Sequence, residues 1–210
     1  MDLLLENYQV QQQQWPDHGQ HILAQYSQDI VVVYQAYRPE IGLYAEQNQG
    51  FGGAFSYSRM SWIKPNFLWM MYRSGWAEKE GQEVVLAIHL KREYFDSILS
   101  SAWPSNNSLG VSDKEWKTGL TQSEVRLQWD PDHNPDGRRV GRRAIQLGLR
   151  ESMLTPFKGE GIIKIENISG FVQEQKKLLD KGLLNQLRTP CERVYPVNDK
   201  LRKVLCMQEG

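Results

Sequence analysis

The chain has 210 residues, which is enough for one domain with a full hydrophobic core. Basic and acidic side chains number 25 each, so no overall charge points to DNA or to a membrane surface. Two cysteines, Cys191 and Cys206, exclude a disulfide scaffold and favour a reducing compartment. No apolar run approaches membrane-spanning length, and Met1 to Leu5 is too short for a signal peptide. We therefore expect a cytoplasmic protein.

Residues 17–28 predict a short helix with Asp17 as its N-cap. His18 and His21 lie three residues apart in this segment, but no third ligand follows at a suitable spacing. We therefore interpret the segment as a surface helix and expect no metal site.

Residues 30–37 form a nearly continuous apolar run, which predicts a strand covered on both faces. Gln35 and Arg38 lie at its end, and Pro39 then begins a predicted helix to about residue 49. Polar side chains at the mouth of a buried strand are common at binding sites. They are also common at ordinary strand ends, so both interpretations of Arg38 stay open.

The segment between Gln47 and Ala77 contains no acidic residue and eight aromatic residues. Its charges are Arg59, Lys64 and Arg73. Cations on an acid-free segment favour an anionic ligand, and structural ion pairs are the alternative.

A glycine cluster within the same segment, Gly50, Gly52 and Gly53, would allow a backbone to approach an anion closely, although a simple turn also explains it. Further along, Pro65 and Gly75 predict the start and stop of a helix over 65–74. This helix is apolar nearly all round, so we expect it to be buried.

Residues 82–90 alternate as a strand, and residues 91–102 have the apolar period of a helix. Residues 122–130 give the clearest strand pattern of the chain, with one apolar face and one polar face. A solvated outer face explains the polar side chains as well as a binding site does. Among them, Glu124 is the carboxylate that we select as a candidate general base or cation stabiliser, and Gln128 is a candidate ligand contact.

Residues 130–137 carry acids in alternate positions, as a calcium loop does. Pro135 stands where such a loop needs glycine, and Gly141 stands where it needs a bidentate glutamate. We interpret this segment as a turn.

Residues 138–150 contain five arginines and no acid. A strand over 144–150 would present Ala144, Gln146 and Gly148 on one face, which leaves room for a ligand. The arginines favour phosphate, with a solvated loop as the alternative. Residues 161–168 then predict a strand, and residues 169–184 an amphipathic helix.

These elements mix without strict alternation, so we expect an α+β fold with a central, mostly antiparallel sheet flanked by helices. We interpret residues 1–16 as an N-terminal extension, 17–188 as a single domain, and 189–210 as a basic C-terminal tail.

Four motifs of the chain resemble an uncharacterised family of bacteria and fungi, domain of unknown function 4291. The motifs are Val-Tyr-Gln-Ala-Tyr-Arg at 33–38, the tryptophan-rich stretch at 59–76, Leu-Gln-Trp-Asp-Pro at 127–131, and Arg-Ala-Ile-Gln-Leu-Gly-Leu at 143–149. The resemblance covers roughly residues 20–180. It implies a fold but no activity.

A weaker resemblance is to the ADP-ribosyltransferase fold, which binds NAD in the cleft of a split antiparallel sheet. It implies an early-strand Arg38 or Gln35, a serine near Ser58 after a glycine turn, and a late-strand Glu124. The order along the chain matches, although Gln-Ala-Tyr replaces the usual His-Gly-Thr or Arg-Gly opening.

Our first hypothesis is therefore an enzyme that transfers ADP-ribose from NAD. Arg38 and Arg59 would hold the pyrophosphate, Tyr57 or Trp62 would stack on the nicotinamide, and Glu124 would stabilise the oxocarbenium-like centre. The predicted site has Glu124 and Arg38 as catalytic residues and no metal; its ligand-binding residues are Gln35, Tyr57, Ser58, Arg59, Trp62, Lys64, Arg73, Gln128 and Gln146.

Two alternatives remain open at this point. A non-catalytic module could bind RNA or another phosphorylated chain through aromatic residues interleaved with Arg59, Lys64, Arg73 and the arginines of 138–150. A protein-interaction domain would instead expose Trp62 or Trp76 in an apolar patch.

Overall fold

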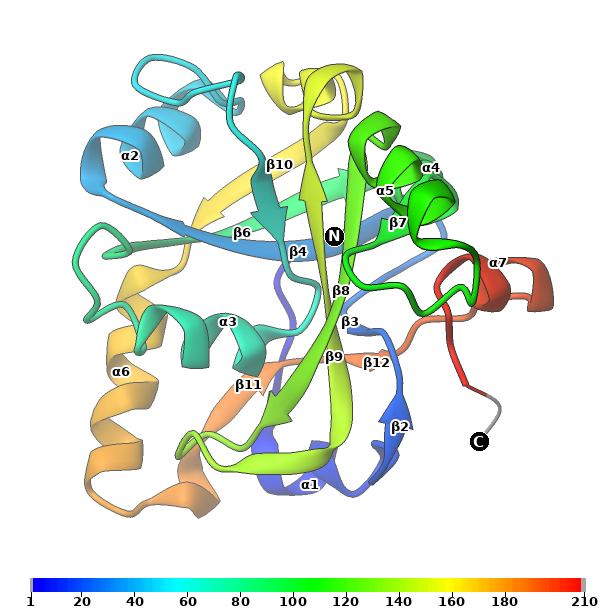
Figure 1. The fold of residues 1–210 in the computed structure, drawn as a ribbon. Coiled ribbons are helices and arrows are strands. Elements are labelled where there is room, and N and C mark those ends of the chain that lie inside the picture. The colour runs from blue at the N-terminus through cyan, green and yellow to red at the C-terminus, as the bar shows by residue number, and fades with distance from the viewer. Residues whose placement is uncertain (1, 209–210) are drawn as a thin grey trace.

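Two sheets that diverge from a shared point form the frame of the molecule (Figure 1). The structure, a computed structural model, describes residues 2–208. The first sheet is antiparallel with the order β10-β6-β4. Its strands are β4 (Ile30–Tyr37), β6 (Val84–Lys91) and β10 (Ile162–Asn167).

The second sheet is centred on a long antiparallel hairpin. Its order is β2-β9-β8-β7, and β5 pairs with β9. The pairs β8–β9 and β5–β9 are antiparallel, whereas β7–β8 and β2–β9 are parallel. Its strands are β2 (Gly19–Gln20), β5 (Ser61–Ile63), β7 (Ala102–Pro104), β8 (Val125–His133) and β9 (Arg139–Leu149).

One pair of residues joins the two sheets. The amide N–H of Tyr34 in β4 donates to the carbonyl of Lys64 at 2.7 Å, and the N–H of Lys64 donates back at 3.2 Å. Beyond this bridge β4 continues with β6, while β5 turns away to pair with β9. In Figure 1 the strands β8 and β9 accordingly run across the direction of β4 and β6.

The predicted double-sided burial of the 30–37 strand is confirmed. Val31 and Val33 pack into the core shared with the second sheet, whereas Val32 and Tyr34 pack into a core with α3 and α6. The residues alternate between the two cores because successive side chains of a strand point to opposite faces. The single domain is therefore an α+β fold with a core on each side of β4.

Four helices cover these cores. They are α2 (Pro39–Asn48), α3 (Phe67–Ser74), α4 (Arg92–Ser100) and α6 (Ser169–Asp180). The predicted burial of α3 is confirmed on all but two residues, Tyr72 and Arg73. Its first turn is capped by the side chain of Asn66 and by the buried carboxylate of Glu192, and Gly75 ends it with a φ of 58°.

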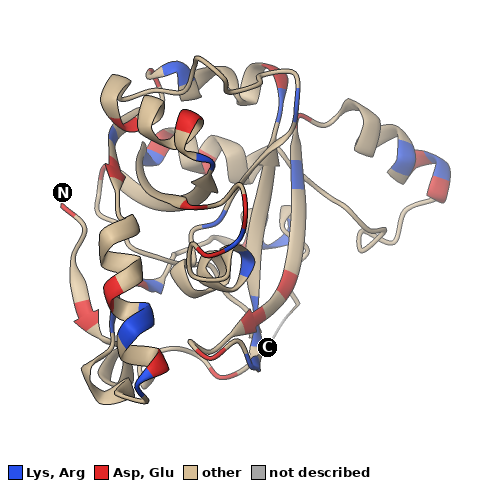
Figure 2. Cartoon of the chain, turned by 90° about the vertical axis from the view of Figure 1, so that its left-hand side faces the viewer, with Lys and Arg blue, Asp and Glu red and all other residues tan. Residues whose placement is uncertain are grey.

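One helix stands away from the body. Helix α5 (Asp113–Gln122) has no buried residue, and Figure 2 shows it projecting with charged residues towards its tip. Its start has an N-cap signal, Ser112, whose side chain accepts from the N–H of Glu115. The sequence analysis did not predict this helix, because it has few apolar residues to reveal a helical period.

Both terminal segments pack against the domain and against each other. Strand β1 (Leu5–Asn7) pairs with β11 (Arg188–Pro190), and β3 (Leu23–Ala24) pairs with β12 (Arg193–Val194). The remaining elements are α1 (Tyr8–Gln12), the 3-10 turns Glu151–Met153, Thr155–Lys158 and Leu184–Gln186, and α7 (Asp199–Val204).

The predicted helix over 17–28 is wrong, because this segment forms the short strands β2 and β3. Gly19 adopts a φ of 85° there, and both strands pair with distant parts of the chain. Pairing across the sequence therefore outweighs local helix propensity. Across residues 2–208, none of the helices combines the length and the apolar character that a bilayer crossing requires.

Candidate functional site

A cavity of about 560 Å³ lies where β4 and β5 separate. Strands β4, β5, β8 and β9 contribute to it, together with α3 and the loops before β5 and β6. Eight of the predicted site residues line it: Gln35, Arg38, Arg59, Trp62, Lys64, Arg73, Gln128 and Gln146.

Lys64 is the most unusual residue of the cavity. Its side chain is only 4% exposed, yet no hydrogen bond or ion pair of the ammonium group occurs among residues 2–208. Burial, together with the nearby charge of Arg73, lowers its pKa to about 8. A lysine that is mostly buried and whose ammonium has no protein partner is costly, so a structure that retains one commonly uses it for a ligand or for chemistry.

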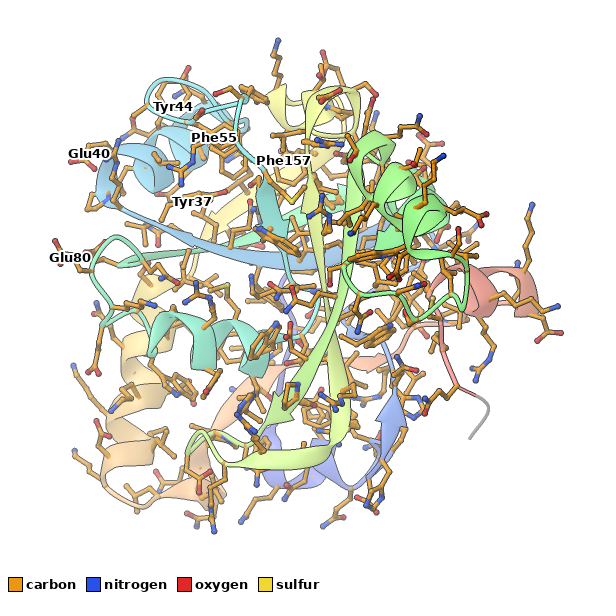
Figure 3. The ribbon with its side chains drawn as sticks, viewed as in Figure 1. Tyr37, Glu40, Tyr44, Phe55, Glu80 and Phe157 are labelled. Atoms are coloured by element: carbon orange, nitrogen blue, oxygen red, sulfur yellow. The ribbon has the colours of Figure 1, made fainter. Side chains whose placement is uncertain are left out.

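Three arginines lie around Lys64 in the lining. Arg59 and Arg73 are exposed, and neither forms an ion pair within the described part of the chain. Arg38 pairs weakly with Glu40 at 3.5 Å, and both side chains are exposed. Figure 3 shows Glu40 and Glu80 at the outer edge of the molecule. Among residues 2–208, no carboxylate belongs to the cavity lining, so the cavity carries a local positive charge in a neutral protein.

One carboxylate, Asp130, lies behind the lining and accepts hydrogen bonds from two amides. The side-chain NH₂ of Gln128 donates to one oxygen of Asp130 at 2.8 Å, and that of Gln146 donates to the other at 2.7 Å. The two glutamines are register partners on β8 and β9. Asp130 raises the pKa of Lys64, against the effects of burial and of Arg73. Both glutamines that were predicted as ligand contacts line the cavity, whereas Asp130, which holds them, was not predicted.

Gln35 lines the cavity, and its amide is held by the strand next to it. Its NH₂ donates to the hydroxyl of Ser61 at 2.8 Å and to the carbonyl of Trp62 at 3.0 Å. This fixes the orientation of the amide, because the carbonyl of Trp62 can only accept. The remaining oxygen, Oε1, is buried without a hydrogen-bond partner, although Gln35 lines the cavity and is 3% exposed.

Trp62 and Met60 form the wall of the cavity that lies over β9. Strand β5 brings Trp62 opposite Gly148. A Cβ added to Gly148 would lie 3.0 Å from the Trp62 ring and 2.5 Å from the sulfur of Met60. The space beside Gly148, which the sequence suggested for a ligand, is therefore filled by the protein's own side chains.

Tyr37 and Phe55 form the third wall, towards α2. Tyr37 packs edge-on against Phe51 and Phe55, and Phe51 tilts against Phe157. Figure 3 shows Tyr37, Phe55 and Phe157 on the side of β4 that faces α2. The hydroxyl of Tyr37 bonds to that of Ser61 at 2.9 Å. The cavity therefore has aromatic walls as well as cations.

Three predicted site residues do not line the cavity. The hydroxyl of Tyr57 donates to the carbonyl of Phe51 at 2.9 Å, and the ring contacts Lys158. Ser58 is exposed and exchanges a hydrogen bond with Ser56. Glu124 precedes β8, four residues or about 13 Å of strand from Gln128.

The carboxylate of Glu124 has hydrogen-bond partners within the protein. It accepts hydrogen bonds from the hydroxyl of Ser152 and from the N–H of Met153, and the bond from Ser152 is the main reason that its pKa is lowered. The group therefore links the start of β8 to the 3-10 turn after β9. Its catalytic role stays a prediction.

Several other candidate features have partners within the protein. Arg138 pairs with Asp136, Arg142 pairs with the buried Asp132, and Arg150 binds carbonyls near the end of α5. The glycine cluster at 50–53 packs against Tyr44 and the backbone of Lys158, so it meets protein atoms. Trp76 is 6% exposed and donates to the carbonyl of Pro135, so it forms no exposed apolar patch.

The cavity residues that the sequence analysis missed are mainly neutral. Tyr37, Phe55, Met60, Ser61 and Gln82 also line the cavity. Tyr37 and Ser61 had a signal, since they flank residues that were selected at the ends of β4 and β5. Within residues 2–208 no group of three or more histidine, cysteine, aspartate and glutamate side chains is arranged to hold a metal ion.

A comparison with curated proteins found no match. A family model described as "Domain of unknown function (DUF4291)" matches residues 21–195. This range contains all the strands that form the cavity and all four motifs on which the resemblance rests. The chain therefore belongs to the DUF4291 family.

Proposed function

We propose that this protein binds a small anionic ligand with a flat ring, of the size and kind of a nucleotide, in the cavity between β4 and β5. The observation that carries the proposal is Lys64, a nearly buried residue of the cavity lining whose ammonium group has no hydrogen bond or ion pair among residues 2–208. A ligand phosphate would supply the missing partner in a charge-assisted hydrogen bond.

The rest of the lining supports the same ligand class. Arg38, Arg59 and Arg73 add positive charge at more exposed positions, which attracts anions from solution. Trp62 and Tyr37 offer aromatic surface for a base. A volume of about 560 Å³ is within the usual range for small-molecule sites.

Calorimetry with ADP tests this proposal. Wild type is expected to bind ADP, and Lys64→Met is expected to weaken binding at least ~10-fold, since a hydrogen bond to a charged group contributes about 1.5–3 kcal/mol. Lys79→Met is the matched control, because Lys79 is an exposed lysine in the loop before β6. Absence of ADP binding by wild type, or equal effects of the two variants, would refute the proposal.

ADP-ribosyl transfer from NAD is the narrower candidate. It is supported by a cavity that opens where two largely antiparallel sheets split, with Arg38 and Arg59 in its lining. The transfer also needs a carboxylate near the ribose. Glu124 would have to reach the ligand from outside the lining, which requires the 3-10 turn at 151–153 to move.

Calorimetry with NAD and an assay for nicotinamide release separate the narrow candidate from the broad one. A transferase binds NAD and releases nicotinamide, and Glu124→Gln abolishes release while leaving binding intact. If ADP binds but no nicotinamide is released from NAD, the proposed anion-binding site is kept and the transferase candidate is refuted. The RNA-binding alternative predicts instead an affinity for mixed oligonucleotides that falls steeply with added salt.

A further inference from the structure

We propose that Lys64 is a nucleophile, and that the cavity takes a phosphorylated aldehyde or ketone whose carbonyl carbon forms an imine with the Lys64 amine. This inference deepens the proposed function and rests on it, because it assigns the reacting group and the substrate class to the same cavity.

The first support is the position of Lys64. Its backbone N–H and C=O both pair with Tyr34, and the next two residues are Pro65 and the N-cap of α3, Asn66. The side chain therefore starts from a fixed point in the sheet junction and reaches the cavity wall while staying 96% buried. A nucleophile needs this kind of fixed position relative to its substrate.

The second support is that residue 64 is a lysine and not an arginine. Arginine holds phosphate at least as well and is always charged, and this cavity already has three arginines in its lining. Lysine differs in that burial and a neighbouring cation can make it give up its proton. Lys64 has both conditions, because it is buried and Arg73 lies near it, and its pKa is accordingly lowered to about 8.

The surrounding charges then define the substrate. The exposed arginines Arg59 and Arg73 would bind a phosphate, which brings the rest of the substrate against Lys64. Asp130 raises the pKa of Lys64, and each of its oxygens accepts from a glutamine amide. Within residues 2–208 Asp130 forms no salt bridge with Lys64, so the amine remains available.

The step balances without a further reagent. The lone pair of neutral Nζ adds to the carbonyl carbon, and one proton of Nζ moves to the carbonyl oxygen to give a carbinolamine. The hydroxyl group then leaves with the second proton of Nζ as water, and a C=N double bond to Nζ remains. The reaction is reversible, so the imine can be hydrolysed. While it exists, the protonated imine can accept an electron pair from the neighbouring carbon.

Pyridoxal 5′-phosphate is a suitable probe, since it combines an aldehyde, a phosphate and a flat ring. The full-length protein is incubated with one equivalent, reduced with borohydride and mapped by peptide mass spectrometry. We expect Lys64 to be labelled at least tenfold more than Lys79, and we expect pyridoxal without phosphate to label it much less. The initial rate should rise with pH to a midpoint near 8.

Lys64→Arg is the decisive variant, because it keeps the charge and removes the nucleophile. It should lose the label at this position, whereas Lys79→Met should keep the label at Lys64. Label spread evenly over exposed lysines, or no excess at Lys64, overturns the inference even if ADP binds. Failure of ADP to bind to wild type refutes the proposed nucleotide site separately.

Discussion

Two buried cations of this protein are in opposite situations. Arg142 on β9 is 7% exposed and has a full set of partners: Asp132 at 2.8 Å, the carbonyl of Pro16 at 2.7 Å, and the ring of Trp15 at 5.2 Å. Lys64 is 4% exposed and has no such partner in the described chain. Burial alone therefore does not distinguish a structural cation from a functional one; the partners do.

The two sites also differ in what surrounds them. Arg142 connects the N-terminal segment to the β8–β9 hairpin, because Trp15 and Pro16 lie on one side of it and Asp132 on the other. Lys64 faces a cavity and a neighbouring cation. The first arrangement stabilises the fold, whereas the second lowers stability, which is what the proposed reactive or binding role of Lys64 would require.

The largest expected effect is at the partnered cation. Arg142→Met removes the counterion of Asp132, which is 1% exposed, and leaves a buried carboxylate without its ion pair. Breaking a buried pair in this way costs about 3–5 kcal/mol. Urea unfolding should show this loss, and the double variant Arg142→Met with Asp132→Asn should recover part of it. A loss below about 1 kcal/mol would contradict the structural role.

Replacing Lys64, the cation without a partner, should have the opposite effect on the free energy of unfolding. The folded pKa of Lys64, about 8, lies below its ordinary 10.5, so the folded state resists protonation. This difference corresponds to ~3 kcal/mol of destabilisation at pH 7, and Lys64→Met should therefore stabilise the protein by about 1–3 kcal/mol. Unfolding by urea at pH 7 measures it. A destabilised variant would contradict the assignment.

The difference in stability between wild type and Lys64→Met should also depend on pH. Between pH 8 and 10.5 the unfolded state binds more protons at Lys64 than the folded state, so the stability of wild type rises there with pH. The advantage of Lys64→Met is therefore complete below pH 8 and disappears by about pH 10.5. Other groups titrate equally in both proteins, so the difference between the two curves isolates Lys64.

A cation with partners but less burial should have an intermediate effect. Arg150 donates through Nε to the carbonyl of Ser123 at 2.9 Å and through its terminal NH₂ to the carbonyl of Thr121. These carbonyls lie near the end of α5, where intrahelical partners are lacking. Arg150→Gln should cost about 1 kcal/mol and should increase amide hydrogen exchange in α5. Unchanged exchange in α5 would show that these contacts do not hold the helix.

The sequence predicted the main strands and helices because their apolar patterns are strong. The continuous run at 30–37 and the alternation at 122–130 give β4 and β8, and Pro65 and Gly75 bracket α3. The segment 17–28 was predicted wrongly because its structure depends on strands more than a hundred residues away. Local patterns carry no information about such pairing.

The cavity lining was predicted only in part, because local patterns identify its cations but not the partners that the fold brings to them. An acid-free segment with three cations identified Arg59, Lys64 and Arg73, and all three line it. Composition could not distinguish Lys64 from Arg142, since both are cations on segments poor in acids. The counterion of Arg142 lies ten residues before it across a hairpin, and only the fold brings the two together.

The smallest expected effect on stability is at an exposed cation without partners. Arg59 lines the cavity but is exposed, so its charge remains solvated in the folded state. Arg59→Gln should change the free energy of unfolding by less than about 0.5 kcal/mol. It should nevertheless weaken ADP binding several-fold, and the weakening should shrink as salt is added, because exposed charges are screened. Calorimetry at low and high salt measures this; a salt-independent loss would mean that Arg59 shapes the cavity and does not act by its charge.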